Sequence, residues 1–376
     1  FHDKSLIRFL TEYSNIDRKI TLEESLQSSK KTILCFLMHP RFHVDAVWNY
    51  KTHFFDKLFK NENILKNIKS GNLVLLLNFG FEADNFCVEN HDMLGNYSKV
   101  FKSISDMYGL PNNSVIILSS NLKGKSINPA FHVIYDNILE YSSFKDIKGN
   151  YDFQYTFDDY ISNVKNASKT LLRINRTSLL SRDVLLWYLY MSDSIDKCLV
   201  EHKCIEQDVS KFKYELEFCR NACDELNLQN IKKYFEFDLD MYKLIQSKLP
   251  HISSEFEMIN EIGGVFSNEK IPNDVYANTI FSWVSTTFPE KNNQVFLNAS
   301  TFNPMLNYHP LVYHGNYQII SYLNEMGFKS YDFLYNESAI NNSHNSYQRC
   351  MLSVNSINNI LSIDIKKIID IIIDNR

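Results

Sequence analysis

Three arginines follow one apolar segment and form the stretch of this sequence best suited to chemistry. Residues 173–182 read RINRTSLLSR, so Arg173, Arg176 and Arg182 lie where an expected strand ends and an expected helix begins. A guanidinium group offers a planar fork of N–H donors that matches phosphate oxygens. A helix N-terminus adds backbone amides and a favourable dipole. The stretch therefore predicts a binding site for a nucleotide diphosphate, and the alternative is a solvated basic turn.

A second stretch, residues 295–328, predicts a helix start close to a buried strand. Asn298 or Ser300 is suited to cap a helix that begins near Thr301, because their side chains accept hydrogen bonds from the first backbone amides. A helix start that faces the carboxyl ends of parallel strands is a ready anion site. These residues are therefore further candidates for donor binding.

The same stretch continues with a strand and a second helix. The short apolar run 310–313 predicts a buried parallel strand. Residues 317–326 have helical spacing, and Gly327 is placed to end that helix as a C′ glycine.

Residues 295–332 resemble the C-terminal motif of a phage and bacterial glycosyltransferase family that is related to the α1,3-fucosyltransferases. The family pattern is roughly F-L-T-E-K-T-F-K-P-I, then H-P-F-I-x-x-G, a short helix and G-F-K-T-F-D. The matching residues here are Phe296, Leu297, Thr301, Phe302, Pro304, His309, Pro310, Gly315, Gly327, Phe328, Lys329 and Asp332. The family's T-E-K triplet is Asn298-Ala299-Ser300 in this chain, and its second Lys is Asn303. The resemblance implies that the missing Glu would bind ribose hydroxyls and the missing Lys a phosphate.

The arginine stretch is similar to the family's L-N-R-R-P-R-x-H-R motif, with Asn175, Arg176 and Arg182 at matching positions. Tyr276 and Asn278 occupy the place of an aromatic donor-site residue of the family, just before an expected strand. The residues expected to bind the donor are thus Arg173, Asn175, Arg176, Arg182, Tyr276, Asn278, Asn298, Ser300, Thr301 and Phe302.

Two residues of the first half are candidates for the catalytic base. Glu82 follows the apolar run 73–79, and a carboxylate at the carboxyl end of a strand is placed to take a proton from an acceptor hydroxyl. Related fucosyltransferase-like enzymes hold a Glu in their acceptor domain, and Glu82 is the best match to it. His39, at the end of the first expected strand, is the rival base. The alternatives are an ordinary loop carboxylate and a hydrogen-bonded histidine at a strand end.

The elements that would position these residues alternate between strand and helix. Strands are expected at 31–38, 73–79, 115–118, 131–135, 169–174, 198–201, 278–288 and 310–313, and helices at 48–65, 97–108, 181–191, within 208–248 and in the C-terminal tail. This alternation predicts an α/β fold with parallel doubly wound sheets. Residues 143–168 are polar and are the expected linker between domains.

The resemblance implies a GT-B architecture, in which two Rossmann-like doubly wound domains face a cleft. The expected domains are 1–160 on the acceptor side and 161–350 on the nucleotide-sugar side, the latter with a helical insertion, followed by a C-terminal helix over 351–376. Such a helix often crosses back to the first domain in GT-B enzymes, and packing on the second domain is equally consistent with the sequence.

Composition sets limits on other classes of protein. The net charge of −5 argues against a surface that grips a polyanion throughout, and 10 glycines in 376 residues give no glycine-rich phosphate loop. Seven cysteines without a C-x-x-C motif or a secretory leader indicate a reducing compartment, so we expect the cytoplasm, or the host cytoplasm for a phage protein. No apolar run is long enough for a membrane span. Asp238-Leu239-Asp240 matches a D-x-D string, but it lies in a helical region, so we expect no metal site.

The sequence thus predicts an enzyme that moves a sugar from a nucleotide-sugar donor, with UDP or GDP, to an acceptor hydroxyl. We expect an inverting, metal-independent reaction without a tightly bound cofactor, and a glycan as acceptor. One alternative is a phage DNA-modification enzyme that acts on 5-hydroxymethylpyrimidine bases. Another is a degenerate sugar- or nucleotide-binding paralogue without activity, because the donor motif lacks its Glu and Lys.

Overall fold

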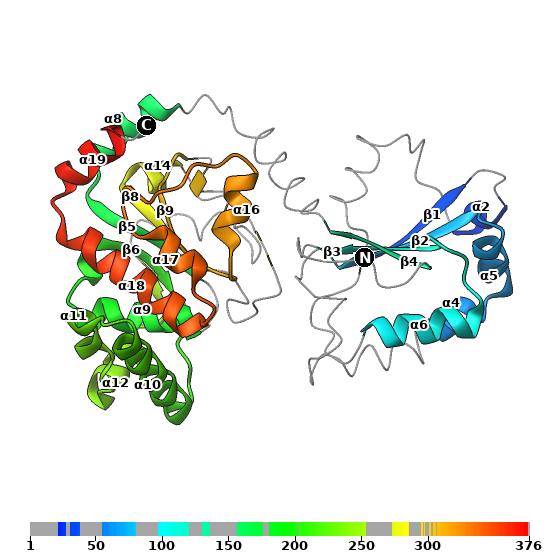
Figure 1. The fold of residues 1–376 in the computed structure, drawn as a ribbon, viewed down its shortest axis with the longest axis horizontal. Helices are drawn as coiled ribbons and strands as arrows, with labels where there is room; N and C mark the ends of the chain where they lie inside the picture. The colour runs from blue at the N-terminus through cyan, green and yellow to red at the C-terminus, as the bar shows by residue number, and fades with distance from the viewer. Residues whose placement is uncertain are drawn as a thin grey trace. The chain divides into compact units, whose positions relative to one another are not determined.

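The computed structural model contains two compact units (Figure 1). The first comprises residues 1–146 and 293–296, and the second comprises residues 147–292 and 297–376. Each unit is described by itself. The structure describes residues 22–27, 31–37, 55–79, 97–119, 130–135, 156–175, 180–202, 204–252, 273–285, 295, 297, 301, 304–305 and 307–374.

The first unit is built on a parallel sheet whose strand order follows the chain. Among the described residues this sheet has four strands in the order β1-β2-β3-β4. They are β1 (Thr32–Leu37), β2 (Leu73–Phe79), β3 (Val115–Ser119) and β4 (Phe131–Tyr135). The described helices of this unit are α2 (Leu22–Gln27), α4 (Asp56–Phe59), α5 (Glu62–Lys69) and α6 (Tyr97–Tyr108).

Apolar side chains of the strands and helices form the core of this unit. Leu75 and Leu77 of β2 are fully buried, as are Val115 and Ile117 of β3, and Ile64 and Ile68 of α5 pack with them. A near-continuous apolar run suits a parallel strand that is covered on both faces.

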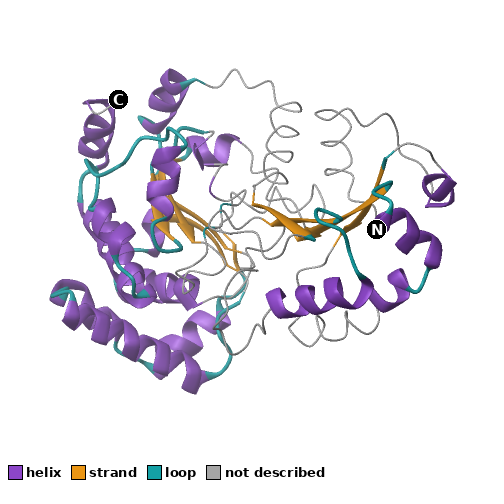
Figure 2. Cartoon of the chain, turned by 45° about the vertical axis from the view of Figure 1, so that its right-hand side comes forward, coloured by secondary structure: helices purple, strands orange, loops and turns teal. Residues whose placement is uncertain are grey.

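The second unit contains a sheet whose first strand along the chain, β5 (Lys169–Asn175), is the central one. Its order among the described strands is β7-β6-β5-β8-β9, and every pair is parallel except β6 with β7. The strands are β5 (Lys169–Asn175), β6 (Cys198–His202), β7 (His251–Ile252), β8 (Thr279–Ser285) and β9 (Leu311–His314). All side chains of β6, β8 and β9 are buried, and Figure 2 shows helices packed beside this sheet.

The helices of the second unit share one core with the sheet. Helix α9 (Leu180–Met191) contributes Trp187 and Tyr188 to this core, and helix α18 (Ser346–Ser362) contributes Met351 and Ile357, all nearly or fully buried. The helical elements are α8 (Phe157–Val164), α9 (Leu180–Met191), η2 (Ile195–Lys197), α10 (Val209–Glu225), α11 (Gln229–Lys232), η3 (Lys233–Phe235), α12 (Leu239–Ser247), α14 (Asn273–Ala277), α16 (Ile319–Glu325), α17 (Glu337–Asn342), α18 (Ser346–Ser362) and α19 (Ile365–Asp374).

Cysteines mark the contact between α10 and α18. Cys219 and Cys223 of α10 and Cys350 of α18 are buried, whereas Cys204, before α10, is exposed. Burial raises the pKa of the Cys223 and Cys350 thiols to about 12, so both stay protonated at neutral pH.

The ends of several helices follow from single residues. Gly327 has φ of +94° and follows α16, as the sequence predicts for a C′ glycine. Asp208 caps α10 and Asp238 caps α12, each by accepting hydrogen bonds from two backbone amides of the first turn. Asp238 of the D-x-D string is therefore a helix cap.

The region expected to be a linker is partly a core helix. Residues 157–164 form α8, which begins with a capping box between Thr156 and Asp159. Tyr160 and Val164 are fully buried in the core of the second unit, and the Tyr160 hydroxyl donates a hydrogen bond to the Ile280 carbonyl at 2.8 Å. The chain is divided at 146/147 rather than near residue 160.

The C-terminal region contains two helices where the sequence predicted one. The end of α18 and the whole of α19 lie within residues 351–376, and they are separated by Ile363 and Asp364. Ile368, Ile369 and Ile372 of α19 pack into the core of the second unit. The helix thus follows the second of the two roles that the sequence left open.

The fold is therefore mixed α/β with two mainly parallel sheets, in agreement with the coarse prediction. A helix that is long and apolar enough to cross a membrane is not found among the described residues.

Candidate functional site

The strand order of the second sheet defines one place for a ligand. From β5 the chain moves to β6 on one side and later to β8 and β9 on the other. In open parallel sheets, ligands bind at the carboxyl ends of the strands where the direction of the strand order reverses. Here that point lies between the carboxyl ends of β5 and β8, which we call the switch point. The first sheet has no such reversal among its described strands.

Arg182 lies at the switch point. It belongs to the first turn of α9, which follows β5, and its Nη2 atom donates a hydrogen bond to the carbonyl oxygen of Ser285 at 3.1 Å. Ser285 is the last residue of β8. Burial lowers the pKa of Arg182 to about 10, and the neighbouring Asp183 carboxylate opposes this shift. A charged guanidinium is therefore held where β5 and β8 diverge.

Asp183 and His202 form a buried pair beside Arg182. The Nε2 atom of His202 lies 3.0 Å from Oδ1 of Asp183, and both side chains are almost completely buried. The other oxygen of Asp183 accepts a hydrogen bond from the backbone amide of Glu206 at 3.0 Å. The sequence reasoning missed this pair. Its signal was an Asp directly after Arg182 and a His at the end of the next strand.

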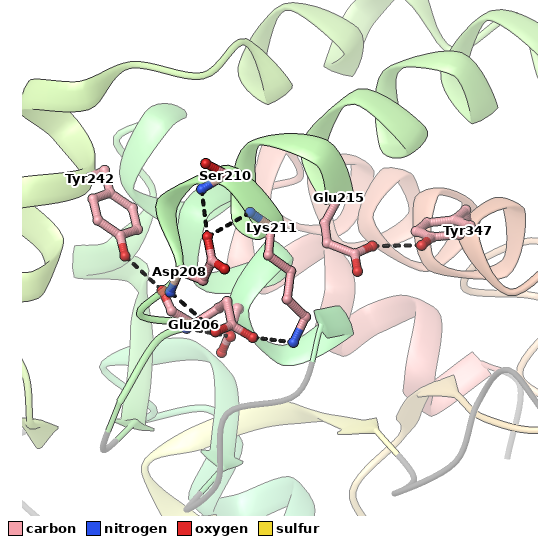
Figure 3. Close-up of polar contacts among 8 residues, drawn as sticks. Glu206, Asp208, Ser210, Lys211, Glu215, Tyr242 and Tyr347 are labelled. Atoms are coloured by element: carbon pink, nitrogen blue, oxygen red, sulfur yellow. Dashed lines mark hydrogen bonds and ion pairs between the residues drawn. The ribbon is translucent and has the colours of Figure 1, made fainter.

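A polar cluster around the start of α10 fixes the segment that contains Glu206 (Figure 3). Lys211 forms an ion pair with Glu206, and Tyr242 of α12 donates a hydrogen bond to the Glu206 carbonyl at 2.7 Å. Asp208 caps the helix, with 2.9 Å from Ser210 N to its Oδ1 atom. This cluster joins α10 and α12 to the segment that contacts Asp183.

The carboxyl end of β9 contributes His314 next to Ser285. The two residues are register partners, and the Nδ1 atom of His314 lies 3.5 Å from Oγ of Ser285. Burial, with Arg349 and Arg182 nearby, lowers the pKa of His314 to about 3. His314 is therefore neutral between two arginines.

Arg349 of α18 braces the turn after β9. Its Nε atom donates to the Gly315 carbonyl at 3.0 Å, and its Nη1 atom donates to the Ser343 carbonyl at 2.6 Å. The Arg349 side chain is 1% exposed, so it stabilises this edge of the sheet from inside and does not face the solvent.

The structure brings only some of the predicted residues to this edge. Thr301 is fully buried, and its Oγ1 atom lies 3.2 Å from the hydroxyl of Tyr313, which pairs in register with Val284 next to Ser285. Arg182 and Thr301 are thus both attached to the carboxyl half of the sheet. The backbones of Arg173 and Asn175 lie in β5, with Asn175 as its last residue.

Tyr276 and Asn278 are placed at the opposite edge of the sheet. Both precede β8, and the Asn278 carbonyl accepts a hydrogen bond from the amide of Lys169, the first residue of β5. Tyr276 is buried, and its carbonyl lies 2.8 Å from Nε2 of His309. A strand rises about 3.3 Å per residue, so seven-residue β8 separates them from Ser285 by roughly 20 Å. The structure does not bring them to Arg182.

Several predicted residues lie outside the described part of the chain. They are Glu82, His39, Arg176, Asn298, Ser300 and Phe302. The helix expected near Thr301 is described only in part, through Thr301, Pro304 and Met305. In the described part of the chain, no group of three His, Cys, Asp or Glu side chains could hold a metal ion.

Comparison of the chain with protein-family models, with curated proteins and with solved structures found no match.

Proposed function

We propose that this protein is a glycosyltransferase that uses a nucleotide-sugar donor and binds the donor's diphosphate at the switch point of the second sheet. The observation on which this rests is the hydrogen bond from Arg182 to the Ser285 carbonyl, which holds a guanidinium between the carboxyl ends of β5 and β8. In doubly wound domains, a nucleotide diphosphate binds at this kind of reversal.

The chemistry needs a cation at this position. When the sugar leaves the donor, the bond between its anomeric carbon and the diphosphate oxygen breaks, and negative charge grows on that oxygen. A preorganised guanidinium stabilises this charge better than water does, because it needs no reorganisation during the reaction. The acceptor hydroxyl attacks the anomeric carbon and gives its proton to a base, for which Glu82 is the candidate and His39 the rival.

The transfer of a sugar, rather than another reaction of a nucleotide, is proposed from the sequence motifs. The arginine stretch and the 295–332 stretch occur in the order of the fucosyltransferase-related family. Two α/β units with mainly parallel sheets are compatible with the two Rossmann-like domains that this resemblance implies. A metal ion is not needed in this proposal, and Asp238 of the D-x-D string has a role as a helix cap.

Titration calorimetry with UDP and GDP tests the binding step. We expect the wild-type protein to bind one of them and Arg182→Ala to bind it at least about tenfold more weakly, because a charge-assisted hydrogen bond is lost. Lys243→Ala is the matched control, since it removes one positive charge from the exposed face of α12. Absence of binding to either nucleotide, or equal binding by wild type and Arg182→Ala, would contradict the proposal.

A panel of nucleotide sugars tests the reaction. We expect release of nucleotide diphosphate from one donor in the wild type, and faster release when a suitable acceptor is added. A protein that binds nucleotide but releases no diphosphate from any donor, with glycans or with hydroxymethylated DNA present, would be a non-catalytic paralogue.

A further inference from the structure

We propose that Asp183 and His202 are positioning residues for the donor site, which hold the Arg182 guanidinium in place for the diphosphate. This inference rests on the proposed function and adds two residues that neither touch the nucleotide nor belong to the sequence motifs.

Asp183 is fixed from two sides. Oδ1 lies 3.0 Å from Nε2 of His202, at the end of β6, and Oδ2 accepts the Glu206 amide at 3.0 Å. Both oxygens of the carboxylate are thus held by groups outside α9. A buried carboxylate with partners on each oxygen keeps its orientation, because breaking either contact would leave a polar group unsatisfied.

The charge of Asp183 is suited to hold its neighbour. Burial of Arg182 disfavours its charged form and lowers its pKa, and the Asp183 carboxylate opposes that effect. Arg182 and Asp183 are consecutive residues in the first turn of α9, so the contacts of Asp183 with His202 and Glu206 also fix the backbone from which Arg182 reaches the Ser285 carbonyl.

Helices α10 and α12 of the second unit hold the segment that contacts Asp183. The Glu206 amide donates to Asp183, while the Glu206 side chain pairs with Lys211 and its carbonyl accepts the Tyr242 hydroxyl (Figure 3). The helical insertion thus has a role at the donor site through the segment between β6 and α10, in addition to enlarging the core.

A double-mutant cycle on nucleotide affinity tests the inference. It uses Asp183→Asn, Arg182→Ala and the double variant in the full chain, with the nucleotide, UDP or GDP, that the wild type binds. We expect Asp183→Asn to weaken binding about tenfold in the wild-type background and to have no further effect when Arg182 is already Ala. A merely structural role would weaken binding equally in both backgrounds, and that result would overturn the inference.

His202 provides a second route if Asp183→Asn reduces the folded fraction. His202→Gln keeps an N–H donor for Asp183 and is expected to retain affinity, whereas His202→Leu lacks the donor and is expected to lose about tenfold. Asp224→Asn is the control, since it alters an exposed ion pair with Lys232 and leaves this network intact. Equal affinities of the two His202 variants would overturn the inference even where Arg182→Ala supports the proposed function. A wild type that binds neither nucleotide would overturn both.

Discussion

The Nδ1 atom of His309 lies 3.0 Å from Oγ of Ser282, and both side chains are buried. The other ring nitrogen lies 2.8 Å from the Tyr276 carbonyl, which can only accept. Nε2 therefore carries the proton, and Nδ1 accepts from the Ser282 hydroxyl. His309 is thus a neutral cross-link between β8, the end of α14 and the start of β9, which gives this motif residue a structural role.

Replacement of His309 is expected to destabilise the second unit. His309→Ala would leave a cavity, would remove the acceptor of the Ser282 hydroxyl and would leave the Tyr276 carbonyl with Thr279 alone, and we expect a loss of about 3 kcal/mol in the free energy of unfolding. Urea unfolding followed by tryptophan fluorescence measures this, since Trp187 and Trp283 lie in the same unit. Asn278→Ala, at an exposed position, is the control and should change stability by less than about 0.5 kcal/mol. Equal stability of His309→Ala and the control would refute the structural role.

Stability should fall in mild acid because of the buried histidines. Burial lowers the pKa of His309 to about 4, whereas an unfolded histidine has a pKa of about 6.5. The stability linked to His309 is complete above about pH 6.5 and is lost as the pH falls toward 4, because only the unfolded state binds the proton in that range. The upper limit is about 3 kcal/mol, and His314 acts in the same direction.

Unfolding midpoints in urea at pH values from 7.5 to 4.5 measure this dependence. The exposed carboxyl groups of Asp159 and Asp224 have lowered pKa values, chiefly through hydrogen bonds with Thr156 and Lys232 respectively. Their contribution is lost only below about pH 4, so it does not interfere in this range. A midpoint that stays constant down to pH 4.5 would show that His309 is not buried in its neutral form.

Asp238 offers a direct test of cap against metal ligand. Asn caps a helix as well as Asp does, so Asp238→Asn should keep stability, whereas Asp238→Ala should cost about 1 kcal/mol. We expect donor cleavage by Asp238→Asn to equal that of the wild type with or without a chelator. A loss of activity in Asp238→Asn that added Mn²⁺ restores would instead indicate a metal ligand.

Tyr160→Phe tests whether α8 is part of the second unit. The change removes the hydroxyl that donates to Ile280 and leaves a buried carbonyl without this donor, so we expect a loss of about 1 to 2 kcal/mol. Phe157→Leu, at a partly buried position of the same helix, is the comparison and keeps the hydrogen bond. If Tyr160→Phe did not change stability, the contact between α8 and β8 would not form in solution.

Arg182→Lys separates charge from geometry at the switch point. Lysine keeps the positive charge but lacks the planar fork that can bond the Ser285 carbonyl and an oxygen of the ligand at once. We expect Arg182→Lys to bind the nucleotide more weakly than the wild type and more tightly than Arg182→Ala. Added salt should weaken its binding more than it weakens binding by the wild type. An affinity equal to that of the wild type would mean that charge alone matters there.

The sequence predicted the strands closely, and the division of the chain at 146/147 lies within the expected linker 143–168. The mainly apolar runs 73–79 and 131–135 match the bounds of β2 and β4, because strands of a parallel sheet bury most of their side chains. The later part of the expected linker is the helix α8, which the sequence did not predict because only Tyr160 and Val164 of its eight residues are buried and the others give it a polar composition. The tail was predicted as one helix because isoleucines continue past Ile363, where the helix ends.

A residue of the candidate site could be predicted only where its side chain suits the ligand and its place at the end of a strand or the start of a helix is evident from the sequence. Arg182 at a helix start after a strand has an evident use, and the structure places it at the switch point. Tyr276 and Asn278 were assigned by their place in a motif, although their position just before a strand already puts them at its amino end, away from the carboxyl ends where Arg182 lies. Asp183 and His202 were missed because their pairing depends on the positions of α9 and β6 in space.

The buried thiols of α10 and α18 can report how often these two helices separate, because a buried thiol reacts only when it becomes exposed. Cys204 is exposed, so an alkylating reagent should modify it before the buried Cys219, Cys223 and Cys350, which become reactive only when the two helices part. Their labelling rates, followed by mass spectrometry on intact protein and its peptides, would report how often α10 and α18 separate while the sheet remains folded.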